Sequence, residues 1–257
     1  MNKRKVISPE TIEVKFKNLS ILYKLFNYFY KPFFVVIKSY ILQLMWRHNS
    51  YNKTFEWDWD EINFNRIAIV NLILKKYESP HYLEIGCASN TLFNSIPIKN
   101  KIGVDPSSGG NMRMTSDDFF DSNTAKFDVV FIDGLHTYEQ VRRDVINSLN
   151  NIKNGGWILL HDMLPRNWLE HHVPIVTFRA WTGDVWKVAF ELIETKGIEF
   201  KILKADYGVG IIKVIDSQIT LHNLTEELLH KEFNFFYENL YKLPIIDWIE
   251  VEDWVGN

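Results

Sequence analysis

Polar residues that could do acid–base chemistry close two apolar runs of this 257-residue chain. Asp133 ends the first run, with His136 three positions later, and His161-Asp162 ends the second. If the two runs are neighbouring parallel strands, the side chains at their carboxyl ends converge on one crevice of the sheet. A histidine with a pKa near neutrality suits a general base, so we expect His136 to accept a proton there. A cap on the following helix is the alternative role for this residue.

Asp105 closes an earlier apolar run, about 20 residues after Gly86. In an open α/β sheet, an acidic residue at this place can accept both ribose hydroxyls of an adenosine cofactor. Dinucleotide-binding proteins share this requirement, so Asp105 alone does not choose among such cofactors.

The loop after Tyr82–Gly86 separates two cofactor classes. A dinucleotide-binding loop reads G-x-G-x-x-G, which lets a pyrophosphate approach the backbone. Here Gly86 is the only glycine, and Ala88 and Asn90 occupy the other candidate positions. S-adenosylmethionine has no pyrophosphate, and its ammonium group favours a nearby carboxylate, which Glu84 can supply directly or through water. Asn90 can adopt a left-handed backbone conformation more cheaply than most residues. A turn that binds no ligand is the alternative.

The elements that must position these residues are short buried strands separated by helical stretches. A helix predicted over Tyr138–Asn151 links the third strand to the fourth, which makes a βαβ unit and a parallel sheet. The four strands of this part are predicted over His81–Gly86, Lys101–Asp105, Phe127–Asp133 and Trp157–Asp162.

Two further strands, Glu199–Lys204 and Gly208–Ile215, are separated only by Ala205-Asp206-Tyr207. A parallel crossover needs a dozen or more residues, so this pair must be an antiparallel hairpin. The predicted fold class is α/β, with a Rossmann-like, doubly wound, mostly parallel seven-stranded sheet that ends in this hairpin. Further helices are expected over Trp57–Tyr77 and Glu226–Tyr241.

From about Tyr82 to Val214 the chain resembles the class I S-adenosylmethionine-dependent methyltransferases, in the branch of the macrocin-type and catechol-type O-methyltransferases. The stretches that carry the resemblance are Leu83–Asn90, Gly103–Pro106, Met114–Phe120, Phe127–Asp144, Gly155–Asp162 and Gly183–Lys187. The resemblance implies S-adenosyl-L-methionine as cofactor and a transferase activity. The cofactor-binding residues that follow from it and from the strand ends are Glu84, Gly86, Cys87, Ala88, Ser89, Asp105, Ser116, Asp117 and Asp133.

The resemblance places Thr115-Ser116-Asp117 at the end of the strand that meets the adenine ring. Asp117 or Ser116 could accept a hydrogen bond from the adenine amino group. The same three residues also suit a helix N-cap before Phe119, and both roles can hold at once.

In metal-dependent O-methyltransferases that resemble this chain, a divalent cation is held at positions that match Asp133, His161 and Asp162. The basic residue that takes the acceptor's proton matches His136. His161 stands where the relatives have a carboxylate. Mg²⁺ prefers oxygen ligands, whereas a site with histidine favours Mn²⁺, Fe²⁺ or Zn²⁺. The sequence therefore leaves open a different metal, a site without His161, or no metal.

The resemblance implies an O-methyltransferase, and we expect a small hydroxylated acceptor, with a sugar or glycan precursor first. Trp181 and Asp184 suit stacking on a sugar and hydrogen bonding to it, and suit a buried helix start equally well. A metal-free N- or C-methyltransferase and a non-catalytic cofactor-binding assembly module are the alternatives. Adjacent His171 and His172 point apart, so we expect them in a loop or at the surface.

The chain divides by composition into three segments. Residues 1–56 form a basic, aromatic helical extension, 57–216 the methyltransferase domain, and 217–257 an accessory helix and tail. Residues 1–53 contain ten Lys and Arg against two Glu, in a chain of net charge −3. The extension could cover the site, form a homodimer, or contact a membrane surface through residues 15–46. The acidic body argues against nucleic-acid binding, and the single Cys87 favours a reducing cytoplasmic setting.

Overall fold

The computed structural model describes residues 31–256, without the side chains of Lys31, Pro32 and Asp60. These residues belong to two compact units, one formed by residues 31–48 with 176–179 and the other by 49–175 with 180–256. In the first unit, helix α2 (Lys31–Met45) binds the 176–179 segment, because Ser39 Oγ donates to the Val176 carbonyl at 2.6 Å. Residues 1–30 of the predicted extension lie outside the described residues. Among those described, no helix is long and apolar enough to cross a membrane.

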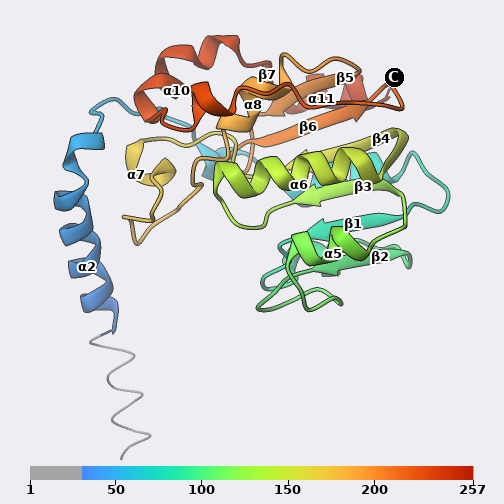
Figure 1. Ribbon diagram of the computed structural model, residues 1–257, viewed down its shortest axis with the longest axis horizontal. Coiled ribbons are helices and arrows are strands. Elements are labelled where there is room, and N and C mark those ends of the chain that lie inside the picture. The colour runs from blue at the N-terminus through green and yellow to red at the C-terminus, as the bar shows by residue number, and fades with distance from the viewer. Residues whose placement is uncertain (1–30, 257) are drawn as a thin grey trace, which may run out of the picture. The chain divides into compact units, whose positions relative to one another are not determined.

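The second unit contains a seven-stranded sheet of order β2-β1-β3-β4-β6-β5-β7 (Figure 1). The strands β2, β1, β3 and β4 are parallel, and β6 is antiparallel to both β4 and β5. The mostly parallel doubly wound fold and its antiparallel hairpin are therefore confirmed. The strands are β1 (Tyr82–Ile85), β2 (Lys101–Val104), β3 (Phe127–Ile132), β4 (Ile152–Leu160), β5 (Ile198–Leu203), β6 (Val209–Val214) and β7 (Ile245–Ile246).

Alternating strand residues divide the core into two layers, one on each face of the sheet. Leu83 and Val130 face a cluster that includes Val141 of α6, whereas Tyr82 and Phe131 face the other cluster. Figure 1 shows α6 lying across one face, with α11 behind the strands. Helices α5 (Ser116–Ser122), α6 (Tyr138–Asn151), α8 (Lys187–Leu192) and α10 (Phe233–Asn239) supply the first cluster. Helices α3 (Arg66–Leu74), α4 (Thr91–Ser95) and α11 (Trp248–Gly256) supply the second.

The seventh strand is not where the resemblance places one. The segment before Ser116 makes only an isolated bridge between Val104 and Met112, so Asp117 lies in the first turn of α5 and not at a strand end. The sheet instead gains β7, whose Ile245 pairs with Ile202 of β5. Residues 217–257 thus supply a strand and the buried Phe233 of α10 to this unit. The division at 56 and 216 stays a prediction.

Helix α6 has the predicted bounds, but the helix predicted over Trp57–Tyr77 is much shorter. It begins at Arg66, because the Asn65 side chain accepts from the backbone N–H groups of Ile67 and Ala68. Residues 50–64 contain no α-helix, and several of their rings stack, for example Phe55 on Trp57 at 5.0 Å. This early cap sets Arg66 at the first helical position.

The predicted C-terminal helix over Glu226–Tyr241 is also interrupted. Helix α9 (Thr225–Leu228) ends before Glu232, whose extended backbone starts α10. The break turns Phe233 and Phe236 into the core, where both are fully buried.

Candidate active site

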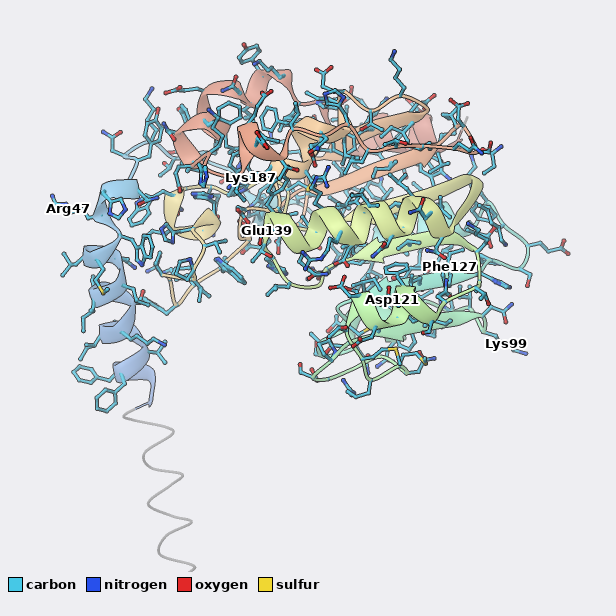
Figure 2. The ribbon with its side chains drawn as sticks, viewed as in Figure 1. Arg47, Lys99, Asp121, Phe127, Glu139 and Lys187 are labelled. Atoms are coloured by element: carbon cyan, nitrogen blue, oxygen red, sulfur yellow. The ribbon has the colours of Figure 1, made fainter. Side chains whose placement is uncertain are left out.

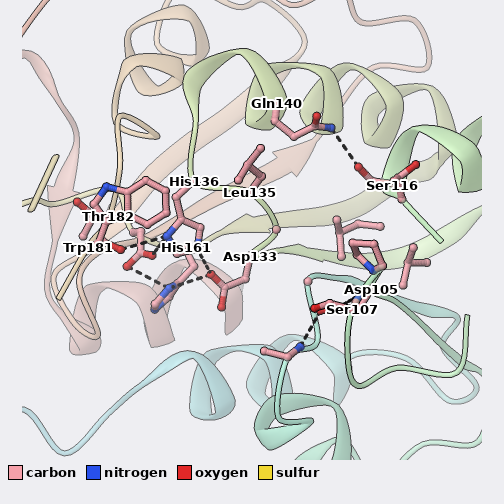
Figure 3. A pocket seen from close by; sticks show the side chains of 18 of the residues that line it. Asp105, Ser107, Ser116, Asp133, Leu135, His136, Gln140, His161, Trp181 and Thr182 are labelled. Atoms are coloured by element: carbon pink, nitrogen blue, oxygen red, sulfur yellow. Dashed lines mark hydrogen bonds and ion pairs between the residues drawn. The ribbon is translucent and has the colours of Figure 1, made fainter. Parts of the chain in front are cut away.

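A cavity of about 800 Å³ lies beyond the carboxyl ends of β2, β1, β3 and β4 (Figure 3). Its size falls in the range of small-molecule sites. Because the strand order is linear, Asp105, Gly86, Asp133 and His161 follow one another along the sheet edge. The cavity therefore has two ends, one at Asp105 and one at the end of β4.

Asp105 is held by backbone N–H groups of the loops around it. Its carboxylate accepts from Ser107 N at 2.8 Å, from Ser108 N at 2.7 Å and from Ala88 N at 2.9 Å. Burial opposes ionisation, but these hydrogen bonds hold the pKa of Asp105 below its ordinary value. The carboxylate is thus a fixed negative charge at the cavity wall.

Gly86 lets two loops approach each other closely. Its φ is +83°, and a Cβ there would lie 2.0 Å from the Asp133 carbonyl oxygen, so no other residue fits. Asn90 has a φ of +64° at the start of α4, which confirms the predicted left-handed conformation. Ala88 also has a positive φ, of +43°, although it is not a glycine. Gly86 and Ala88 both line the cavity.

Three predicted cofactor residues, Glu84, Cys87 and Ser89, are not among the described residues that line the cavity. Glu84 is buried and accepts from Tyr82 OH at 2.8 Å. Burial raises the pKa of Glu84 to about 7. Cys87 is buried, and Ser89 pairs with the Thr91 hydroxyl. A contact between Glu84 and a cofactor would therefore need a bridging water.

The predicted adenine residues lie beside a side chain that the sequence did not indicate. Ser116, Asp117 and Gln140 all line the cavity, and Gln140 Nε2 donates to Ser116 Oγ at 3.1 Å and to Asp117 Oδ1 at 3.3 Å. Thr115 Oγ1 accepts from Asp118 N at 3.1 Å, so the predicted N-cap is confirmed. Gln140 lies on the same face of α6 as buried Asp144, and the helical spacing of these two is the signal that could have found it.

At the other end of the cavity, His136 lies between two carboxylates. Its Nε2 is 3.2 Å from Asp133 Oδ1, and its Nδ1 is 3.0 Å from Asp162 Oδ2. Single ligand atoms of these three residues lie within 4.8 Å of one another. His136 completes this set, and the Nδ1 of the predicted ligand His161 lies 3.3 Å from Asp133 Oδ1 and 3.2 Å from Asp162 Oδ1.

The two carboxylates decide the charge of His136. Burial disfavours the imidazolium, but the hydrogen bonds to Asp133 and Asp162 raise the pKa of His136 to about 10. The expected near-neutral pKa is therefore wrong for this arrangement, because both ring nitrogens face acids. The ring stacks on Trp181, with centroids 5.3 Å apart. Gly183 packs against the His136 backbone, where a Cβ would lie 1.7 Å from the carbonyl oxygen.

Two charged residues that the sequence did not indicate complete this end. Arg66 Nη1 donates to Asp133 Oδ2 at 3.1 Å, and Arg66 Nε lies 3.4 Å from Asp206 Oδ2. Buried His161 contacts Asp133 at 3.3 Å, Asp206 at 3.3 Å and Arg66 Nη1 at 2.9 Å. We call Arg66, Asp133, His136, His161, Asp162 and Asp206 the charged cluster.

Residues 83–163 match the family model described as a methyltransferase domain. This part of the chain is a class I, S-adenosylmethionine-dependent methyltransferase domain. Curated protein sequences gave no match.

Solved structures similar to the methyltransferase domain have low identity. MycE of the mycinamycin biosynthetic pathway, in complex with Mg, SAH and mycinamycin VI, is 16% identical, with 56% of this chain and 48% of MycE covered and a TM-score of 0.39. The O-methyltransferase TomG from Streptomyces achromogenes, with SAM, is 15% identical over 58% of this chain and 79% of TomG, with a TM-score of 0.41. SAH-bound PaMTH1 from Podospora anserina is 14% identical over 84% of this chain and all of PaMTH1, with a TM-score of 0.43. This chain spans about half the length of MycE. Similarities this weak say nothing of acceptor or metal.

Of the two predicted acceptor residues, Trp181 and Asp184, only the first lines the cavity. Trp181 lines the cavity and donates from Nε1 to the His172 carbonyl at 2.9 Å. Asp184 does not line it. Asp184 Oδ1 instead accepts from Tyr138 N at 2.6 Å, which caps α6, and Oδ2 accepts from Lys187 Nζ at 2.9 Å (Figure 2 labels Lys187 near the start of α6).

The prediction placed His171 and His172 in a loop or at the surface. Both are buried, so the surface placement is wrong, and His172 lies in the loop that follows the short helix α7 (Trp168–His171). His171 Nε2 lies 3.0 Å from Glu232 Oε2, and its Nδ1 accepts from Trp186 Nε1 at 3.3 Å. These hydrogen bonds satisfy the ring in the core, a role that adjacent spacing in sequence does not reveal.

The cavity fits S-adenosylmethionine by charge. This cofactor carries a sulfonium and an ammonium against one carboxylate, and the cavity wall contains the acids Asp105, Asp117, Asp133 and Asp162 together with Arg66, His136 and His161. The donor set of Asp133, His136 and Asp162 also fits a divalent cation, with two carboxylates and one imidazole.

Proposed function

We propose that the protein is an S-adenosylmethionine-dependent O-methyltransferase that acts on a small hydroxylated acceptor, with a sugar or glycan precursor first. The observation that carries this proposal is the Asp133–His136–Asp162 arrangement in the same cavity as Asp105. A ribose-binding carboxylate at one end and proton-handling groups at the other suit methyl transfer to a hydroxyl. When bound, S-adenosylmethionine supplies the methyl group on a sulfonium, which the acceptor oxygen attacks.

The chain's own residues hold the acceptor and its proton. The stacked Trp181 and His136 rings wall the cavity beside Thr182, so a hydroxylated acceptor lies between an aromatic face and acids. Holding the oxygen in line with the methyl group supplies part of the rate. His136 can accept the acceptor's proton only in its neutral form, which becomes abundant as the pH approaches about 10 or when its two acids are otherwise engaged.

Asp133, His136 and Asp162 would hold a divalent cation, Mg²⁺ or Mn²⁺. Such an ion would lower the pKa of the acceptor hydroxyl, and a His136 nitrogen that holds the ion cannot at the same time accept the acceptor's proton. Two acids and one imidazole favour Mn²⁺ over Mg²⁺.

We place the protein in the cytoplasm as a homodimer, with residues 1–56 as the segment that covers the site, pairs subunits or contacts a membrane surface. The single cysteine, Cys87, is buried and free, which suits a reducing compartment. The excess of Lys and Arg in residues 1–53 supports the membrane contact.

The proposed function is tested by methylation assays with sugar and phenol acceptors, with and without a chelator, in which the product mass shows that a methyl group was added and NMR shows which atom carries it. Methylated oxygen in the product supports the proposal, and methylated nitrogen or carbon contradicts it. Full activity in excess chelator would show that the reaction needs no metal ion. Calorimetry with S-adenosylhomocysteine tests the cofactor, and no binding at about 1 mM would contradict a methyltransferase function. His136→Ala should lose activity and keep cofactor affinity.

A further inference from the structure

Arg66 is the only arginine or lysine among the described residues that line the cavity. It lies at the first helical position of α3, outside the stretch of the chain that resembles methyltransferases. Arginine is charged at every physiological pH, so this end of the cavity holds a permanent cation. The proposed function assigns no role to the Arg66 guanidinium.

Asp206 fixes Arg66 through two contacts. Its Oδ2 accepts from the Arg66 backbone N–H at 3.0 Å and lies 3.4 Å from Nε. Asp206 and Tyr207 are the central residues of the hairpin turn, with φ of +50° and +62°, and Gly208 N closes the turn on the Ala205 carbonyl. Because the turn fixes the carboxylate, the guanidinium is held in place before any ligand arrives.

The guanidinium retains donor capacity. Nη1 and Nε face Asp133, His161 and Asp206, whereas Nη2 makes no hydrogen bond within residues 31–256. The side chain is 31% exposed. The unbonded Nη2 can donate a charge-assisted hydrogen bond to a carboxylate.

Arg66 and Asp133 form an ion pair of 3.1 Å at the cavity wall. An α-amino acid carries an ammonium and a carboxylate on one carbon, so adjacent opposite charges are complementary to it. The linear strand order adds direction. With adenosine at Asp105, the amino-acid part of the cofactor extends past Gly86 toward Asp133 and Arg66.

We propose that Arg66 binds the α-carboxylate of S-adenosylmethionine and that Asp133 binds its ammonium. The inference rests on the proposed function, because it assumes this cofactor. It gives the ammonium to Asp133 in place of Glu84, which does not line the cavity. Asp206 acts through Arg66 and is a positioning residue.

Calorimetry with two ligands tests the proposal. S-adenosylhomocysteine has the carboxylate, and its decarboxylated analogue keeps the ammonium but lacks the carboxylate. For Arg66→Ala we expect the affinity for S-adenosylhomocysteine to fall roughly 10- to 100-fold, as for a lost charge-assisted hydrogen bond. The affinity for the analogue should change less than about twofold. Removing the Arg66 side chain and removing the ligand's carboxylate delete the same interaction, so the second deletion adds little to the first. Arg66→Lys keeps the positive charge but lacks the planar guanidinium, so its affinity for S-adenosylhomocysteine should lie between those of the wild type and Arg66→Ala.

Asp206→Asn should lower the affinity for S-adenosylhomocysteine by a smaller factor, on the order of threefold, and leave the affinity for the analogue unchanged. Lys75→Ala, at the exposed end of the same helix, is the matched control and should bind both ligands as the wild type does. Thermal melts check that each variant is folded.

Equal losses for both ligands in folded Arg66→Ala, or no loss for either, would overturn the inference and leave the proposed function standing. Wild-type protein that binds neither ligand would contradict the proposed function itself. A variant that binds S-adenosylhomocysteine normally but has a raised acceptor KM would also overturn the inference, by assigning Arg66 to the acceptor.

Discussion

The two ends of the cavity are built in different ways. At the Asp105 end, one carboxylate is held by backbone N–H groups of residues that follow β1 and β2 directly. At the other end, the charged cluster unites side chains from α3, the ends of β3 and β4, and the β5–β6 turn. Backbone donors cannot be exchanged by mutation, whereas each charge of the cluster depends on its neighbours. The first end is suited to fixed binding and the second to chemistry that moves protons.

The largest effect is expected at the charged cluster, for Asp133→Asn. Asp133 contacts Arg66, His136 and His161. Asparagine removes the negative charge that these three groups share and keeps only one of the two acceptor oxygens. We expect kcat/KM to fall roughly 100- to 1,000-fold, the size found when one electrostatic group of an active site is removed. Steady-state methylation assays measure this.

Asp128→Asn is the matched control for Asp133→Asn. Asp128 lies at the start of β3, where its Oδ2 accepts from Lys153 Nζ and from His81 N, each at 2.7 Å. The substitution should cost stability but keep activity per folded molecule, because this end of the strand is remote from the cavity wall. Similar losses of activity in both variants would show that the charged cluster has no special part in the chemistry.

A smaller effect is expected at the other end, for Asp105→Asn. The asparagine side chain keeps one carbonyl oxygen but directs an NH₂ group at backbone N–H donors, so the loop loses hydrogen bonds. We expect the affinity for S-adenosylhomocysteine to fall about 10-fold, and that for 5′-methylthioadenosine by the same factor, because both contain the ribose. Calorimetry with the two ligands measures this. A loss of affinity for S-adenosylhomocysteine but not for 5′-methylthioadenosine would show that Asp105 does not bind the ribose.

The same contrast explains what could be predicted from the sequence. Strands β1 to β6, helix α6 and the hairpin follow from local patterns, as do Asp105 and the left-handed Asn90, but strand β7 does not. Short-range rules of strand ends and turns are enough for these features.

The charged cluster depends on contacts between distant segments. Arg66 is one basic residue in an apolar helix, and its partner Asp206 lies in the three residues between two predicted strands, so no local pattern pairs them. The sequence suits Asp184 equally to an acceptor contact and to the start of its own helix, but Asp184 caps α6, whose first residue Tyr138 lies 46 positions earlier. No local pattern carries such information, because tertiary packing chooses the partners.

The smallest effect on ligand binding is expected for Glu84→Gln, which lies behind the cavity between the two ends. Burial raises the pKa of Glu84 to about 7, above its ordinary value of 4.5. The native state therefore keeps a proton that the unfolded chain has lost between these two values. The contribution of Glu84 to stability is constant below pH 4.5, falls as the pH rises to 7, and is constant again above it.

Glu84→Gln has no such titration, so its stability relative to wild type should rise by on the order of 2 kcal/mol between pH 5 and pH 8. Denaturant unfolding at several pH values measures the difference. Burial also raises the pKa of Asp144, to about 6, but Asp144 is present in both proteins and cancels. The affinity for S-adenosylhomocysteine should change less than about threefold, because glutamine can still accept from Tyr82 OH. A tenfold or greater loss of affinity (about 1.4 kcal/mol) without the pH trend would mean that Glu84 is ionised and reaches the ammonium. Asp133 would then not be the residue that binds the ammonium of the cofactor.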